Sequence, residues 1–243
     1  MNEPAIPMIG DQADQRRMTL IAHLRELRNR LVIVAIALSI TTLLSTVFAW
    51  RLFYFLVLPL GGRVPQAISP TETIITYFKV ALVAGVVLAM PVIVYQFARF
   101  LLPGLMPQER RYLYILVPGA SIMFLLGVAF TAMVMLPRMI AFLMAFGSDF
   151  VEQQWTLNEY ISFVTSLLFW IGLAFETPLV IFFLAKMKIV TYETLVKNFR
   201  YAILVVAIVA AVITPTPDPF NMLVVMFPLL GLYAFGVLLA RLA

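Results

Sequence analysis

Three carboxylates are the residues best placed for chemistry, and Glu176 has the most unusual surroundings of the three. It lies in a long apolar stretch, ten residues before Lys186, which places it about 15 Å along a helix from that lysine at ~1.5 Å per residue. A charge there costs at least ~2.5–3.5 kcal/mol, so the carboxyl is expected to face other helices, meet water or be protonated. We predict a membrane-embedded functional acid; a structural acid bonded to a neighbouring helix is the alternative.

Glu26 and Glu109 are the other two carboxylates, and both lie beside apolar stretches rather than within them. Glu26 belongs to an amphipathic segment and is spaced i,i+4 from Arg30, as expected of a surface helix. Glu109 falls in the first turn of a predicted helix, where it favours the helix dipole and can pair with Arg110 or Arg111. The functional alternative is a recognition site for the segment of Glu26, and binding of a cationic ligand at the cytoplasmic surface for Glu109.

The sequence lacks the residues that most catalytic and metal-binding sites require. The chain has no cysteine and one histidine, His23, which excludes thiol catalysis, disulfides and metal centres built from Cys or several His. We find no Ser/His/Asp set and no Gly-rich phosphate loop, so we expect no enzyme, no ATPase, no metal and no cofactor. A proton-coupled secondary transporter using Glu176 is the alternative function, although the sequence shows neither an internal repeat nor a second acid facing Glu176.

The composition requires a membrane protein to position these side chains. Of 243 residues, 63% are hydrophobic and 12% are charged, whereas an ordinary soluble domain carries roughly 25% charged residues. A soluble globule could not cover so much apolar surface. The net charge of +5 is explained by basic residues retained on the cytoplasmic side, so no nucleic-acid partner is expected.

Six apolar stretches predict an all-α, polytopic membrane protein with six transmembrane helices. We expect a single domain over residues 1–243, with a polar tail at 1–17, an amphipathic cytoplasmic helix at 18–30 and a membrane bundle at 31–240. Helices five and six are expected to be short, and two longer outer loops lie near 51–72 and 137–158. The predicted spans are 31–50, 73–98, 112–136, 159–185, 201–213 and 220–240.

The distribution of Lys and Arg predicts the orientation of these spans. With the N-terminus inside, thirteen of the seventeen basic residues fall in inside segments and three in outside segments, and Lys79 lies within a span. Because basic residues are retained in the cytoplasm, both termini are expected to be cytoplasmic.

Local patterns also predict where several helices begin. Residues 69–72 and 156–159 have the spacing of capping boxes, and Asp218, before a proline, is predicted to cap the last helix. The residues themselves give Pro59 no role beyond a bend and Phe100 none beyond an interfacial aromatic.

Seven short motifs follow one another along residues 19–240. They are His23-Leu-Arg-Glu-Leu-Arg-Asn-Arg30, Ser69-Pro-Thr-Glu72, Pro91-Val-Ile-Val-Tyr-Gln96, Pro103-Gly-Leu-Met-Pro-Gln-Glu-Arg-Arg111, Tyr160-Ile-Ser-Phe163, Phe175-Glu-Thr-Pro178 and Thr214-Pro-Thr-Pro-Asp218. This ordered set resembles the TatC family, the multi-span signal-peptide receptor subunit of the twin-arginine (Tat) protein translocase.

The resemblance implies a site for signal peptides that carry two consecutive arginines. Glu109 matches the family's loop acid that binds the arginine pair. Glu26 and Arg28 match N-terminal residues that support this recognition, and Phe100 matches an aromatic of the same cytoplasmic loop. Carboxylates suit this ligand because an Arg–carboxylate pair can be bidentate. Glu26 and Glu109 are expected on the same side of the membrane, so one ligand can meet both.

The resemblance also implies the wider system. Glu176 matches the family's intramembrane acid, Pro59 a proline of the first outer loop, and Asp218 the acid between the last two helices. The implied protein lies in the bacterial cytoplasmic (inner) membrane. It works in the lipid bilayer with TatA- and TatB-like single-span proteins and with further copies of itself. It exports folded cargo using the proton gradient, with no catalysis of its own.

Overall fold

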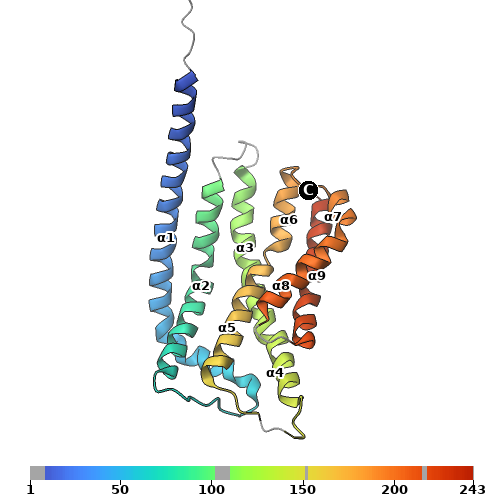
Figure 1. Cartoon of the computed structure of the whole chain (residues 1–243). Helices are drawn as coiled ribbons and strands as arrows, with labels where there is room; N and C mark the ends of the chain where they lie inside the picture. Colours follow the sequence, from blue (N-terminus) through green and yellow to red (C-terminus); the bar gives the residue numbers. More distant parts are fainter. Residues whose placement is uncertain (1–8, 102–109, 151–152, 215–217, 243) are drawn as a thin grey trace, which may run out of the picture.

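The computed structural model describes residues 9–101, 110–150, 153–214 and 218–242, with side chains described from residue 21 onward except at 101 and 110–115. Helices make up most of this part of the chain (Figure 1). In chain order they are α1 (Ile9–Val57), the 3₁₀ turn η1 (Leu58–Leu60), α2 (Glu72–Leu101), α3 (Arg110–Phe130), the π-helical segment η3 (Thr131–Met135), α4 (Leu136–Ala145), α5 (Leu157–Ala174), α6 (Thr177–Lys186), α7 (Tyr192–Lys197), α8 (Phe199–Ile213) and α9 (Pro219–Arg241).

The predicted membrane bundle is confirmed. Within the described ranges, five helical stretches are long and apolar enough to cross a membrane, and α8 is a sixth, shorter apolar helix of 15 residues. The predicted shortness of helix five is therefore confirmed. The predicted shortness of helix six is wrong: helix six is α9, whose 23 residues are enough for a crossing at about 20 residues per span.

The first helix differs from its prediction in one respect. The amphipathic segment at 18–30 is helical, but it is the first part of the single 49-residue helix α1 rather than an element of its own. The sequence explains this continuity, because residues 11–57 contain neither Pro nor Gly, the residues that most strongly interrupt helices. At ~1.5 Å per residue α1 is about 73 Å long, and Figure 1 shows it extending beyond the neighbouring helices.

The fourth span is broken rather than continuous. We predicted one continuous span over 159–185, but α5 ends at Ala174 and α6 begins at Thr177. Proline lacks an N–H and its ring clashes with the carbonyl four residues earlier, which explains why the break precedes Pro178. The N–H of Glu176 donates to the carbonyl of Leu173 at 3.1 Å, closing the last turn of α5.

Two connections at the end of the bundle opposite the start of α1 are held together. The N–H of Gln66 donates to the carbonyl of Trp155 at 3.0 Å, and the N–H of Leu157 donates to the carbonyl of Gln66 at 2.9 Å. A carboxylate oxygen of Glu72 accepts from the N–H of Asn158. These bonds fix the start of α2 beside the start of α5 (Figure 1).

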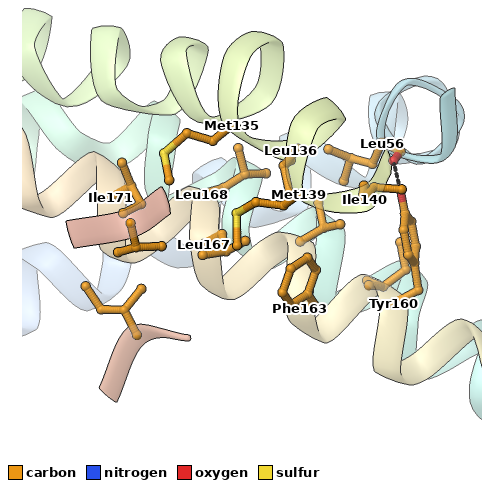
Figure 2. Close-up of a cluster of buried hydrophobic side chains, with 14 of the residues drawn as sticks. Leu56, Met135, Leu136, Met139, Ile140, Tyr160, Phe163, Leu167, Leu168 and Ile171 are labelled. Atoms are coloured by element: carbon orange, nitrogen blue, oxygen red, sulfur yellow. Dashed lines mark hydrogen bonds between the residues drawn. The ribbon is translucent and has the colours of Figure 1, made fainter. Parts of the chain in front are cut away.

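The main apolar core surrounds α5. Its fully buried members include Met139 and Ile140 of α4 and Leu167 of α5 (Figure 2), together with Ala210 of α8 and Val225 of α9. The Tyr160 hydroxyl donates to the carbonyl of Leu56 at 2.6 Å, which ties the end of α1 to this core.

The part of α1 around Thr41 and Thr42 depends on α2 for its position. The two helices approach so closely at Gly85 that a Cβ atom there would lie 2.8 Å from the Cα of Thr42. The hydroxyl of Thr41 donates to the carbonyl of Gly85 at 2.8 Å. Large side chains on other faces of α1 are exposed, among them Leu43 and Val47, so this crossing places α1 in the bundle.

Candidate functional site

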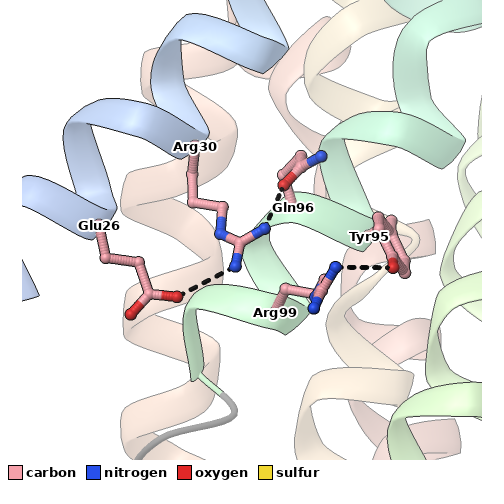
Figure 3. Close-up of polar contacts among 5 residues, drawn as sticks. All are labelled: Glu26, Arg30, Tyr95, Gln96 and Arg99. Carbon is pink, nitrogen blue, oxygen red and sulfur yellow. Dashed lines mark hydrogen bonds and ion pairs between the residues drawn. The ribbon is translucent and has the colours of Figure 1, made fainter.

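A polar cluster joins α1 to the end of α2 (Figure 3). The guanidinium of Arg30 donates through Nη2 to Glu26 Oε1 at 3.1 Å and through Nη1 to Gln96 Oε1 at 3.0 Å. Gln96 is buried, so Arg30 is anchored on α2 and in turn orients the Glu26 carboxylate. The predicted Glu26–Arg30 pair is confirmed; Gln96 was not singled out as a site residue, because nothing local in the sequence reveals its partner 66 residues away.

Aromatic and cationic groups extend this cluster along α2. The ring of His23 stacks on that of Phe100, with centroids 4.4 Å apart and an interplanar angle of 24°. Arg99, the residue before Phe100, donates to the hydroxyl of Tyr95, one turn earlier on α2, at 3.3 Å. Phe100 is therefore held against α1 immediately before the segment that contains Glu109, which lies outside the described residues.

The Glu26 carboxylate retains accepting capacity on an open surface. Its side chain is 29% exposed, and the Arg30 bond uses only Oε1. Beside it lies a hollow of about 430 Å³ formed by one face of α1, with Ala22, Asn29 and Ile33 among its lining residues. A carboxylate accepts at both oxygens, so Oε2 can receive a further cationic donor from this hollow.

Arg28 lies apart from this cluster. Its side chain is exposed and donates to Asn29 Oδ1 at 3.5 Å. Arg28 lies two positions after Glu26, which at ~100° per residue is more than half a turn round the helix. The structure therefore brings Glu26 and Phe100 toward each other and leaves Arg28 on another face of α1.

Glu176 lies at the break between α5 and α6, in the middle of the fourth span. Its Oε1 atom is buried and has no hydrogen-bond partner among the described residues. Its neighbour Phe175 packs on α3, with its ring 5.6 Å from that of Phe130. The structural alternative, an acid bonded to a neighbouring helix, therefore finds no bond in the described part of the chain.

The hydroxyl groups earlier in the same span as Glu176 have other hydrogen-bond partners. The hydroxyl of Thr165 donates to the carbonyl of Ile161 within α5 at 2.6 Å, and Ser162 accepts from Lys79 of α2 at 2.7 Å. Ser162 is fourteen residues from Glu176, about 20 Å along the helical path, so it belongs to the opposite end of the bundle.

Pro59 and Asp218 also lie at that opposite end, far along the chain from Glu26. Pro59 is half-buried in η1, where its fixed φ suits a tight turn. Asp218 is the N-cap of α9, and its Oδ1 accepts from the N–H of Asn221 at 2.7 Å. The predicted cap is confirmed; the predicted site residues thus fall at the two ends and the middle of the bundle.

Comparison with known proteins identifies the family. A family model described as Sec-independent protein translocase protein (TatC) matches residues 22–228. The chain belongs to the TatC family. The TatC protein of Carboxydothermus hydrogenoformans is 36% identical over 230 residues, which cover 94% of this chain and 95% of that protein. The TatC protein of Deinococcus radiodurans is 37% identical over 230 residues, covering 91% and 85%.

Comparison of the fold with solved structures identifies the same family. A crystal structure of a twin-arginine translocase receptor, TatC, has a TM-score of 0.80 at 34% identity and covers 90% of this chain and 98% of that one. The TatC match spans every site residue predicted from the sequence. This chain is therefore a multi-pass membrane component of a Tat protein translocase, and the alternative of a proton-coupled transporter has no support from these comparisons.

Proposed function

We propose that this chain is the receptor subunit that captures twin-arginine signal peptides of folded cargo. The observation that carries the proposal is the Glu26–Arg30–Gln96 cluster, in a chain of the TatC family. It holds the partly exposed carboxylate of Glu26 beside the end of α2, the helix that precedes the segment containing Glu109 in the sequence. The site takes a cation-bearing peptide because its accepting group is an anchored carboxylate beside an open hollow.

The chemistry of two neighbouring guanidinium groups fits two carboxylates. Glu26 Oε2 would accept from one arginine while Arg30 keeps Oε1 in place, and Glu109 would accept from the other. Phe100, stacked on His23, would offer an aromatic face to a guanidinium plane or to the apolar part of the peptide. Arg28, which is exposed, would contact the peptide from the adjoining face rather than join the carboxylates.

The wider arrangement follows from the charge distribution and the family. We place both termini in the cytoplasm and the bundle in the bacterial inner membrane. The protein acts without a cofactor or catalysis of its own, together with TatA- and TatB-like single-span partners and further copies of itself, and transport is driven by the proton gradient. Glu176 is the membrane-embedded acid of this process, and Pro59 and Asp218 shape the outer end.

Photo-crosslinking tests the peptide site. A benzophenone amino acid at Ala22, which lines the hollow beside Glu26, is presented with a labelled twin-arginine peptide and with its twin-lysine version. We expect the arginine peptide to crosslink about tenfold more strongly, because Lys cannot pair in a bidentate fashion. Glu26→Gln should weaken the arginine-dependent signal, and the same label at Ser148, at the opposite end of the chain's bundle, should give none.

Two results would contradict this site. Equal crosslinking of the two peptides would show that this end of α1 does not recognise arginine. An unchanged signal in Glu26→Gln, with a stable and correctly assembled protein, would show that Glu26 is only the helix partner of Arg30.

A further inference from the structure

A second hollow lies at the end of the bundle remote from Glu26, between α4, α5 and the start of α9. Its volume is about 770 Å³. Phe142 of α4 stacks on Phe220 of α9 across its wall, with ring centroids 3.6 Å apart. The aromatic residues of the lining are Phe142, Phe146, Trp155, Tyr160, Phe163 and Phe220.

A cation is fixed behind one wall of this hollow. Lys79 of α2 donates through Nζ to Asn158 Oδ1 at 3.1 Å and to Ser162 Oγ at 2.7 Å. Asn158 and Ser162 both line the hollow. In the part of the chain that the structure describes, no carboxylate forms an ion pair with Lys79. Glu72 lies about two helical turns before Lys79 on α2. Its carboxylate oxygens already accept from the N–H groups of Ile68, Ser69 and Asn158.

A negative charge faces the same space. Glu159 follows Asn158 in the first turn of α5, lines the hollow and is exposed. The side chain of Glu159 makes no ion pair within the described ranges. Asp218 also lines the hollow, so both charged side chains of its lining are acids. The ammonium of Lys79 lies one hydrogen bond behind Asn158 and Ser162.

The position of the hollow limits the kind of ligand. Asn158 and Ser162 lie in the first two turns of α5, where the apolar span Leu157–Lys186 begins. Lys79 is seven residues into α2, about 10 Å along the helix. We therefore place the hollow at the level where a bilayer changes from polar headgroups to acyl chains.

We propose that this hollow binds the headgroup of a zwitterionic phospholipid that carries a primary amine. The phosphate would accept from the amide nitrogen of Asn158, with the charge of Lys79 directly behind that side chain. The ammonium would lie against Glu159 and the aromatic faces, which attract cations through the ring quadrupole. An acyl chain would continue along Phe163. An anionic lipid without an amine matches Lys79 but leaves Glu159 unpaired and facing a like charge.

Native mass spectrometry of the intact protein in detergent tests the site. Phosphatidylethanolamine and phosphatidylglycerol of matched chains are titrated, with soluble glycerophosphoethanolamine as a headgroup without chains. We expect phosphatidylethanolamine to bind tightest, and Lys79→Gln and Glu159→Gln to weaken it about tenfold, the loss expected for one charge-assisted contact. Lys79→Arg keeps the charge and should restore binding if Lys79→Gln only lost the cation.

Glu193→Gln is the matched control. Glu193 is also an exposed first-turn acid, of α7, and its helix is capped by Thr191 as α5 is capped by Thr156. This variant should bind the lipid as the parent does. Circular dichroism and unfolding temperature check that each variant folds; because Glu159 is exposed, its variant tests the site even where Lys79→Gln is unstable.

Several outcomes would overturn the proposal. Equal affinity for the two lipids, or unchanged binding in a folded Glu159→Gln, would show that the hollow does not recognise the headgroup. Equal affinity for glycerophosphoethanolamine would assign the site to a free phosphate ligand rather than a lipid. Lipid-free dimers that dissociate in Glu159→Gln would assign the hollow to a second copy of the chain.

Discussion

Gly85→Ala should separate α1 from α2 and so disturb the site without touching it. A Cβ at residue 85 would lie 2.8 Å from the Cα and 2.9 Å from the N of Thr42, which are backbone atoms that no rotamer change can move. Ordinary contact begins at 3.4 Å, so the helices must part by roughly 0.6 Å at this crossing. If α1 moves as a rigid rod, the 3.0 Å bond from Arg30 to Gln96 stretches to about 3.6 Å, beyond hydrogen-bonding distance.

The stability loss follows from two contributions. Overpacking a close contact typically costs about 1–3 kcal/mol, and the interhelical bond from Thr41 to the carbonyl of Gly85 contributes about 0.6 kcal/mol in a membrane setting. We expect Gly85→Ala to lower the free energy of unfolding by about 2–4 kcal/mol. Denaturant titration in mixed micelles measures this, and crosslinking from position 22 should fall in parallel.

Gly231→Ala is the control for this prediction. Nothing lies within 4 Å of the Cβ that it would add in α9, so it should be neutral or stabilising by up to ~1 kcal/mol. Thr42→Ala in the Gly85→Ala background should restore little, because the tightest backbone contacts remain. Equal stability of Gly85→Ala and Gly231→Ala would refute the close crossing, and full rescue by Thr42→Ala would place the clash in the hydroxyl instead.

Three further substitutions test other parts of the bundle. Asp218→Ala should lower stability by about 1 kcal/mol because the N–H of Asn221 loses its cap, whereas Asp218→Asn should keep it; thermal unfolding distinguishes the two. Tyr160→Phe leaves the buried carbonyl of Leu56 without its donor and should cost about 1–3 kcal/mol, measured in the same way; no loss would mean that water replaces the hydroxyl. Glu176→Leu should retain or raise the unfolding temperature, since a buried oxygen without a partner is removed, yet it should impair gradient-driven export of cargo in vesicles. Full export would reduce Glu176 to a structural residue.

Features that depend on neighbouring residues could be predicted from the sequence. Apolar run length gave the six crossings and the shortness of α8, because a span must satisfy its backbone internally and match the bilayer. The caps at Thr156 and Asp218 were also predictable, since a cap joins groups two or three residues apart. The acid Glu176 was found for the same reason, as a lone charge in an apolar run.

Features that depend on helix pairing could not be predicted. Gln96 meets Arg30 and Lys79 meets Ser162 across 66 and 83 residues, and which faces meet is weakly encoded in helices that are apolar on all sides. Lipid removes the hydrophobic drive between helices, so small residues and a few polar contacts decide the pairing. Gly85 shows how this works: it admits α1 close enough for Arg30 to reach Gln96 eleven residues further along α2. The residues that position this candidate site therefore include a glycine with no chemistry of its own.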